Sequence, residues 1–165
     1  MKSMIEELKK YDIVLILGNY GAGKSSLARE YFGDRKRVNR HEIRYHFKEM
    51  TEHGKKWTTE DWDEEIEGFI KRLEYDIIKF LLERNERIVI DNTSVTKKSR
   101  ERYINYARRF KKSIACLFLK KDVSVLLSQN KMREHAVPEH IIVRLHAKTE
   151  LPTESEGFNK VVVVR

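Results

Sequence analysis

Continuous runs of apolar residues recur along the chain and are separated by longer stretches in which apolar positions are three or four residues apart. The runs cover residues 12–17, 87–90, 114–119 and 161–164, and a shorter extended segment covers 37–39. Unbroken apolar runs are typical of strands that are covered on both faces of a sheet. The pattern therefore predicts about five strands.

The stretches between these runs have the spacing of amphipathic helices. Predicted helices cover residues 25–32, 41–51, 97–110 and 123–130, and a further helix is led by Pro138. Strands that alternate with helices predict an α/β domain with a mainly parallel sheet flanked by helices. In such a domain, ligands bind at the carboxyl ends of the strands.

The longest predicted helix opens at residues 58–61, where Thr58 and Asp61 resemble a capping box. Its apolar positions fit a period of 3.6 residues well and are Ile66, Phe69, Ile70, Leu73, Ile77, Phe80 and Leu81. The chain contains few glycines and prolines, with 7 Gly and 2 Pro, so long flexible linkers are not expected. We predict a single domain over residues 1–165.

A glycine-rich segment between the first strand and the first amphipathic helix fits the phosphate-binding pattern G-x-x-x-x-G-K-[ST]. In this pattern, backbone N–H groups and the helix N-terminus surround a phosphate group. Lys24 is expected to reach the β- and γ-phosphates, and the Ser25 hydroxyl to hold Mg²⁺. The residues expected to bind ATP, or another nucleoside triphosphate, are Gly18, Asn19, Tyr20, Gly21, Ala22, Gly23, Lys24, Ser25 and Ser26.

The charge balance adds a polyanion to the expected partners. The chain has 34 Lys+Arg against 26 Asp+Glu, a formal net charge of +8, which favours nucleic acid. A lysine-rich surface without such a partner is the alternative. The single cysteine, Cys116, lies in a predicted buried strand, and no apolar run is long enough to span a membrane. We therefore expect a cytoplasmic protein without disulfides or membrane contacts.

Two further segments follow strands and carry candidate chemistry. In residues 39–44, His41 and Glu42 are ionisable groups that could take the proton of an attacking hydroxyl. Arg44 lies on one helical face with other basic residues, and a solvated basic face is the alternative interpretation. In residues 91–93, Asp91 could orient Mg²⁺ or its waters, and Asn92 and Thr93 could instead bind a substrate phosphate or hydroxyl. Capping of the next helix by Asp91, Asn92 or Thr93 is the alternative.

A polar loop at residues 131–137 is a candidate lid. Arg133 within it could offset negative charge on a transferring phosphoryl group, although an ordinary exposed loop would look the same. Part of the basic segment at 97–112 is expected to face solvent. Trp57 and Trp62 could stack on a base, but packing roles are the simpler interpretation.

Together these segments resemble the P-loop kinase domain of polynucleotide 5′-hydroxyl kinases over nearly the whole chain. The resemblance is carried, in order, by Gly18–Ser25, Asn39–His41, Asp91–Ser94, Asn130–Arg133, Val137-Pro138, Pro152 and Glu156–Phe158. It implies transfer of the ATP γ-phosphate to a 5′-OH end of RNA or DNA, and a separate ligase or phosphatase as a possible partner.

The resemblance also implies roles for individual residues. Lys24 and Arg133 stabilise the transferring group, and Arg44 grips the acceptor phosphate. The floor of the acceptor site is formed by Asp91, Asn92 and Thr93. The chain departs from the family at His41, where the family's general base is an aspartate, so His41 or Glu42 would serve as the base. It departs again at Gln129, where relatives often have an arginine.

Two other functions remain open on the sequence alone. The histidine at position 41 is compatible with a P-loop kinase of a nucleoside, nucleotide or other small molecule. The net positive charge is compatible with a nucleotide-dependent nucleic-acid-binding module that transfers nothing. An acceptor screen would separate these functions from the polynucleotide kinase.

Overall fold

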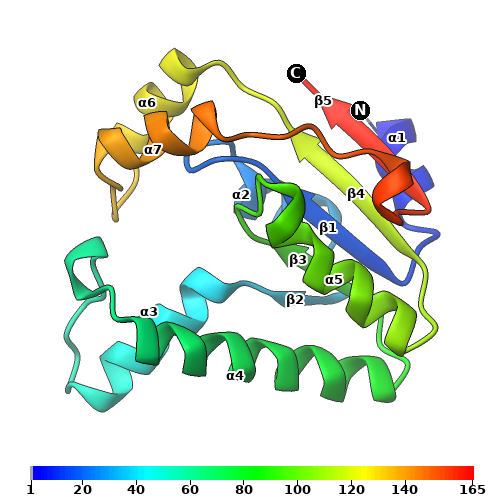
Figure 1. The fold of residues 1–165 in the computed structure, drawn as a ribbon, viewed down its shortest axis with the longest axis horizontal. Helices are drawn as coiled ribbons and strands as arrows, with labels where there is room; N and C mark the ends of the chain where they lie inside the picture. The colour runs from blue at the N-terminus through cyan, green and yellow to red at the C-terminus, as the bar shows by residue number, and fades with distance from the viewer. Residues whose placement is uncertain (1) are drawn as a thin grey trace.

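The computed structural model describes residues 2–165 and contains one parallel five-stranded sheet (Figure 1). The strand order is β2-β3-β1-β4-β5. The strands are β1 (Ile13–Leu17), β2 (Lys36–Val38), β3 (Ile88–Asp91), β4 (Ile114–Leu119) and β5 (Lys160–Val164). This confirms the expected α/β architecture, and each strand lies within two residues of its predicted position.

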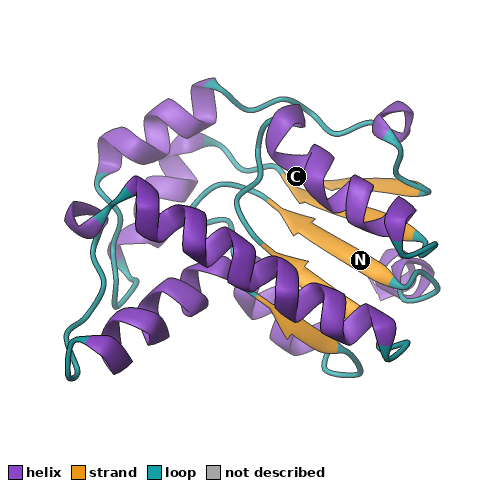
Figure 2. Ribbon diagram, turned by 60° about the horizontal axis from the view of Figure 1, so that its bottom comes forward, coloured by secondary structure: helices purple, strands orange, loops and turns teal. Residues whose placement is uncertain are grey.

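Helices cover both faces of this sheet (Figure 2). The described helices are α1 (Lys2–Leu8), α2 (Lys24–Tyr31), α3 (Arg40–Thr51), α4 (Glu64–Glu83), α5 (Lys97–Arg109), α6 (Val123–Lys131) and α7 (Glu139–Ala147), with 3₁₀ turns at Thr59–Asp61 and Glu154–Glu156. One core cluster joins the sheet to α4 and α5, and the other joins it to α1, α2, α6 and α7. The two apolar layers explain why every residue of β1 and β4 is buried.

The start of the longest helix differs from the prediction. The capping box formed by Thr58 and Asp61 caps the N-terminal end of the short 3₁₀ turn. The helix α4 begins later, with Asp63 as its N-cap. The Asp63 side chain accepts a hydrogen bond from the Ile66 N–H at 2.9 Å. Since the chain takes an extended conformation at Trp62, the turn and the helix are separate elements.

The buried face of α4 also differs from the pattern of apolar residues. The buried positions are Glu67, Ile70, Glu74, Ile78 and Leu82. By contrast, the predicted apolar positions Ile66, Phe69 and Phe80 are 42%, 39% and 59% exposed. The helix is therefore rotated so that two glutamates face inward, where arginines from α3 neutralise them.

One member of the basic segment at 97–112 is a core residue. Arg100 is fully buried and forms an ion pair of 2.7 Å with Glu156. Its Nη1 also donates to the carbonyl oxygens of Val95 and Glu150. Glu156, Gly157 and Phe158, which carried part of the family resemblance, thus have structural roles here: Gly157 has a φ of 119° and Phe158 is buried.

Loss of the buried ion pair is expected to destabilise the fold strongly. Glu156→Ala leaves the buried Arg100 guanidinium without its counter-charge, so the free energy of unfolding should fall by about 3–5 kcal/mol. Urea unfolding followed by circular dichroism measures this loss. The control is Glu101→Ala, at an exposed position next to Arg100 on α5, which should change the free energy of unfolding by less than about 0.5 kcal/mol. Equal effects in the two variants would contradict the assignment.

Among residues 2–165, no helix is both long enough and apolar enough to cross a bilayer. Cys116 is a free cysteine buried in β4, and burial raises the pKa of its thiol. The thiol is therefore held neutral and unreactive inside the sheet.

Candidate active site

A large cavity lies at the carboxyl ends of the strands, where the topology predicts a ligand. It has a volume of about 830 Å³ and is open to solvent. Figure 1 shows α6 and α7 on one side of this region and α3 and α4 on the other. All eight of the predicted catalytic and substrate-binding residues line it: Lys24, His41, Glu42, Arg44, Asp91, Asn92, Thr93 and Arg133. Of the predicted nucleotide-binding residues, Gly18, Asn19 and Ala22 lie outside its lining, and the other six line it.

The phosphate loop connects β1 to α2 and has the backbone that its glycines predict. Gly21 and Gly23 have φ values of 79° and 87°, a region that residues with a Cβ rarely adopt. α2 begins directly at Lys24, so its free N–H groups point into the loop. The Lys24 ammonium donates a hydrogen bond of 2.8 Å to the Asn19 carbonyl. This concave set of donors fits a phosphate anion.

The phosphate loop is braced against the two helices that flank the lid. The Asn19 side-chain amide donates to the Ile142 carbonyl of α7 at 2.8 Å. A Cβ at Gly21 would lie 2.5 Å from the Leu126 carbonyl oxygen of α6, so only glycine allows this approach. The loop, α6 and α7 therefore meet in direct contact.

The protonation state of Lys24 is sensitive to pH near 7. Burial and, to a smaller extent, the positive charge of Arg133 lower the pKa of its ammonium to about 7, and the carboxylate of Asp91 partly opposes them. A bound phosphate would add negative charge and favour the ammonium form. Lys24 is therefore an acceptor for a proton when an anion binds.

Asp91, at the end of β3, fits a role near a magnesium ion. Its Oδ2 accepts a hydrogen bond of 3.0 Å from Arg37, and its Oδ1 is buried without a hydrogen-bond partner among the described residues. A buried carboxylate oxygen without a donor is an available ligand for Mg²⁺ or for its waters. Ser25, in the first turn of α2, lines the same cleft. These two residues fit the ion that a nucleotide would bring.

The two candidate bases occupy different environments. The Glu42 carboxylate accepts a hydrogen bond of 2.9 Å from Arg29 and lies 2.8 Å from Arg37, so two guanidinium groups already engage it. His41 packs edge-on against Trp57 at 5.6 Å between ring centroids. Its Nδ1 is buried and has no hydrogen-bond partner among the described residues. The His41 ring lines the cleft and, unlike Glu42, is engaged by no hydrogen-bond or ion-pair partner among residues 2–165.

Electrostatics keep His41 neutral. Burial lowers its pKa to about 4, and the positive charges of Arg133 and Arg44 act in the same direction. At pH 7 the ring is thus unprotonated and can accept a proton. The positive charge of Arg133, which lines the same cleft, thus lowers the pKa of both Lys24 and His41.

Two buried glutamates of α4 bind the arginines of α3, a feature that the sequence analysis missed. Arg44 donates to both oxygens of Glu67 at 2.6 Å. Arg40 donates from Nε and Nη2 to Glu74 Oε2 at 3.0 and 2.7 Å. Asn92 also donates to Glu74, so this glutamate ties the floor of the cleft to α4. The signal in the sequence is the seven-residue spacing of the glutamates, in register with Ile70 and Ile78.

Two tryptophan rings that do not belong to the cleft lining lie beside Arg44. The guanidinium lies 5.7 Å from the ring centroid of Trp57 and 5.5 Å from that of Trp62. Phe47 packs on Phe69 of α4. These contacts give the aromatic residues packing roles around a fixed arginine.

The predicted lid follows α6 and is closed at its base. The Asn130 side chain donates to the Val137 carbonyl at 2.8 Å and accepts from the Val137 N–H at 3.0 Å. Within the loop, the Arg133 guanidinium stacks 5.7 Å from the ring centroid of Tyr20, which the Lys24 ammonium approaches at 5.9 Å. Tyr20 thus holds both cations beside the phosphate loop.

The lid also reaches across the cleft. Glu134 lies 3.4 Å from the Lys56 ammonium, and His135 packs on Tyr45 of α3 at 5.0 Å between ring centroids. Gln129, where an arginine was expected from the resemblance, is exposed and lines the cleft. The lid therefore contacts α3 and the segment that follows α3 on the other side of the cleft.

A protein-family model, AAA_33 (AAA domain), matches residues 13–152 of the chain. This range contains the phosphate loop, α3, the end of β3 and the lid. The match therefore covers every residue assigned to the cleft.

Two curated proteins are similar over part of the chain. An L-seryl-tRNA(Sec) kinase from Methanococcus maripaludis is 26% identical over 91 residues, which are 55% of this chain and 36% of that protein. A bifunctional polynucleotide phosphatase/kinase from Schizosaccharomyces pombe is 29% identical over 85 residues, 48% of this chain and 21% of that protein. The chain thus matches well under half the length of either relative.

Solved structures share the fold at low identity. A gluconokinase from Sinorhizobium meliloti 1021 superposes with a TM-score of 0.56 and 18% identity, covering 92% of this chain and 80% of that one. A chain of the Pnkp1/Rnl/Hen1 RNA repair complex superposes with a TM-score of 0.67 and 17% identity, covering 82% and 43%. The fold is thus shared with a gluconokinase and with a chain of an RNA repair complex.

Proposed function

The chain belongs to the AAA_33 family of AAA domains and has the fold of P-loop kinases, and we propose that it transfers the γ-phosphate of ATP to the 5′-hydroxyl end of RNA or DNA. The observation that carries the proposal is the shared cleft, in which Lys24 of the phosphate loop and His41 of α3 line one cavity. Because donor and acceptor groups must meet in line, a common cavity is the geometric requirement for direct transfer.

The proposed roles on the donor side follow from the geometry. The backbone N–H groups of the phosphate loop hold the β-phosphate, and Lys24 bridges the β- and γ-phosphates. Magnesium, when bound, neutralises charge on these oxygens, and Ser25 with Asp91 would hold it or its waters. Arg133 stabilises the negative charge that develops on the transferring group.

On the acceptor side, His41 orients the 5′-hydroxyl and accepts its proton as the oxygen attacks the γ-phosphorus. The new P–O bond forms while the bond to the β-phosphate oxygen breaks, and ADP leaves. Asn92 and Thr93 form the floor of this side, and Arg44 lies beside it. Support for a nucleic-acid acceptor comes from the net charge of +8 and from the curated polynucleotide phosphatase/kinase that the chain resembles.

The decisive experiment is incubation with labelled ATP and a panel of acceptors. The panel contains 5′-OH RNA and DNA oligomers, nucleosides and sugars, each with and without Mg²⁺. Label transferred to oligomers and lost on removal of Mg²⁺ supports the proposal. Oligomer binding without label transfer would favour a non-catalytic module.

One observation favours a second candidate, a kinase of a small neutral acceptor. Both oxygens of Glu67 engage Arg44, so this arginine offers less positive charge to an acceptor phosphate than an unpaired one would. A small-molecule acceptor would not need that charge. Label transferred to a nucleoside or sugar in preference to every oligomer would establish this function instead.

His41→Ala is expected to lower kcat by about 10²–10⁴-fold, the usual contribution of a general base. ATP affinity should persist, because His41 lies on α3 and does not belong to the phosphate loop. Glu42→Gln is the matched control, since that carboxylate is engaged by Arg29 and Arg37. A greater loss of kcat in Glu42→Gln than in His41→Ala would transfer the role to Glu42.

The His41 assignment has a readout besides activity. Because burial and two arginines lower its pKa to about 4, its ring signals in the free protein should titrate near pH 4 in NMR spectra. Titration near 6.5, the usual value for histidine, would contradict the buried neutral ring.

The proposal carries three further expectations from the sequence. The phosphate donor is ATP, the protein acts in the cytoplasm, and a separate ligase or phosphatase completes the processing of nucleic-acid ends. The first is tested by comparing nucleoside triphosphates as donors, the second by localisation in the cell, and the third by reactions with purified partner enzymes.

A further inference from the structure

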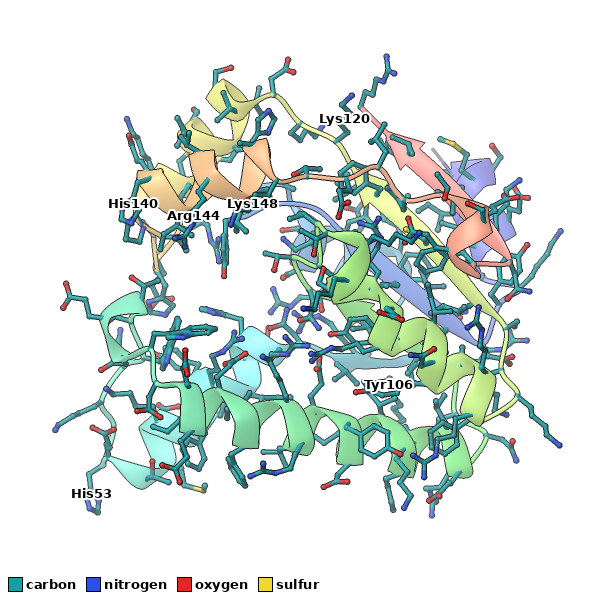
Figure 3. All side chains as sticks on the ribbon, viewed as in Figure 1. His53, Tyr106, Lys120, His140, Arg144 and Lys148 are labelled. Carbon is teal, nitrogen blue, oxygen red and sulfur yellow. The ribbon has the colours of Figure 1, made fainter. Side chains whose placement is uncertain are left out.

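α7 presents a row of basic residues beside the cleft. His140, Arg144 and Lys148 follow one another at four-residue spacing along α7 and its C-cap, so they share one side of the helix. All three are exposed. Figure 3 shows them along the edge of α7 that faces α3 and α4. Leu145 of the same helix lines the cleft, so the row borders its opening.

The basic row continues onto the start of α5. The Glu150 N–H donates to the Val95 carbonyl at 2.9 Å, and the Glu150 carboxylate accepts the Lys97 N–H at 2.7 Å. These bonds join the segment after α7 to the first turn of α5, where Lys97 and Lys98 are exposed. We refer to His140, Arg144, Lys148, Lys97 and Lys98 together as the α7–α5 strip.

The α7–α5 strip differs from the basic residues inside the cleft in forming no ion pairs. Within residues 2–165, none of its members is paired with a carboxylate, whereas Arg37, Arg40 and Arg44 each bind one. Glu139 is paired with Lys131 of α6, and Glu150, which accepts the backbone N–H of Lys97, keeps its negative charge beside the strip. Arg144 and Lys148 are therefore unpaired cations near the mouth of the cleft, and the strip carries an excess of positive charge.

We propose that the α7–α5 strip binds the phosphates of a single-stranded RNA or DNA acceptor beyond the nucleotide whose 5′-hydroxyl reacts. This inference rests on the proposed function and specifies its acceptor as a strand that extends out of the cleft. Arg144 and Lys148 are about 6 Å apart along the helix, at 1.5 Å per residue. That separation is comparable to the distance between neighbouring phosphates of an extended strand. A row of separate cations suits a flexible polyanion better than a single compact anion.

The first test measures binding without catalysis. The probe is a fluorescent, 5′-phosphorylated single-stranded RNA of about twelve nucleotides, within the usual site sizes for single strands, followed by anisotropy over a range of salt concentrations. Because each lost phosphate contact changes the log–log salt slope by about 0.7, Arg144→Ala/Lys148→Ala should reduce it by about 1.4. At about 0.1 M salt the affinity should fall roughly ten- to thirtyfold.

The control removes the same charge near the amino ends of the strands, at the end of the sheet opposite the cleft. Lys10 and Lys36 are exposed, lie before β1 and at the start of β2, and form no ion pair among residues 2–165. Lys10→Ala/Lys36→Ala therefore matches the strip variant in net charge while leaving the cleft mouth intact. Its salt slope and RNA affinity should stay near those of the unaltered protein.

The second test compares acceptors of different length. The ratio of kcat/KM for the oligomer to kcat/KM for a nucleoside 3′-monophosphate should fall about tenfold in the strip variant and stay constant in the control. Equal losses in both double variants, or unchanged RNA binding in the strip variant, would overturn the inference. So would binding of polyglutamate with the same affinity and the same dependence on Arg144 and Lys148.

The binding test also separates this inference from the proposed function. RNA binding that depends on the strip, without transfer to any 5′-OH end, would refute the kinase assignment and support the strip as a nucleic-acid surface. Transfer to short and long acceptors with equal efficiency would support the kinase and refute the strip.

Discussion

Lys24→Ala is expected to lower the rate of phosphoryl transfer by about a thousandfold or more, which exceeds the usual effect of losing one neutral hydrogen-bond donor at a transition state. Lys24 is the cation of the phosphate loop and is held in place by its 2.8 Å hydrogen bond to Asn19. Its removal leaves the charge on the β- and γ-phosphates uncompensated during transfer. Single-turnover assays with labelled ATP and a 5′-OH oligomer measure the loss.

The thermal stability of Lys24→Ala distinguishes a loss of catalysis from a loss of the fold. Because burial lowers the pKa of Lys24 to about 7, the folded protein disfavours the ammonium relative to the unfolded chain, and its removal should leave thermal stability unchanged or raised. An inactive variant with a lowered melting temperature would point to misfolding. Full activity in Lys24→Ala would refute the phosphate-loop assignment.

The same pKa predicts how nucleotide binding responds to pH. A bound triphosphate favours the charged form, so binding above pH 7 must be accompanied by proton uptake. Nucleotide affinity should therefore decrease as pH rises above 7, and Lys24→Met should lose this dependence. Calorimetry in buffers of different ionisation enthalpy detects the proton directly.

Arg133→Ala is expected to lower kcat by about 10³–10⁵-fold, the range found for arginines that neutralise a transferring phosphoryl group. The structure places its guanidinium beside Tyr20, near enough to lower the pKa of both Lys24 and His41. It is thus the one lid cation whose charge reaches both halves of the cleft. Arg133→Lys, which keeps the charge but loses the planar fork, should recover part of the rate.

The pKa values of its neighbours provide an independent measure of Arg133. Without this positive charge, the pKa values of His41 and Lys24 should both rise toward their usual values. NMR titration of the His41 ring in Arg133→Ala tests this without any substrate. An unchanged His41 titration would place Arg133 away from the cleft in solution. Lys131→Ala, in the last turn of α6 and paired with Glu139, is the matched lid control.

The sheet was readable from the sequence because its strands have apolar residues on both faces. The prediction for 114–119 coincides with β4, and the helix at 97–110 coincides with α5 to within one residue. The first helix, α1, was not predicted. Its two buried residues, Ile5 and Leu8, are too few for a periodic signal.

Buried charge was the main feature that the sequence could not reveal. Glutamate in a helix normally faces water, so the pattern on α4 placed Ile66, Phe69 and Phe80 among its apolar positions. Glu67 and Glu74 are buried instead because arginines of α3 neutralise them. The spacing of the glutamates, in register with Ile70 and Ile78, is compatible with burial, but the pairing itself depends on the approach of two helices, and the pattern within one helix does not show it.

The phosphate loop was predictable because its chemistry depends on glycine and lysine at fixed spacing. The choice between His41 and Glu42 was not, since adjacent ionisable residues look equivalent in a sequence. Their surroundings distinguish them: Arg29 and Arg37 engage Glu42, while the Nδ1 of His41 has no partner among the described residues. The assignment of His41 as the base remains a prediction for the kinetic test.

Because the phosphate loop contacts both helices that flank the lid, the length of the lid determines the position of its arginine relative to that loop. Asn19 ties the loop to α7, Gly21 abuts α6, and Asn130 fastens the lid to Val137. Both ends of the lid are thereby fixed relative to the phosphate loop. The number of residues between 130 and 137 then determines how far the guanidinium of Arg133 can reach into the cleft. An insertion there would misplace the charge while leaving every binding residue intact.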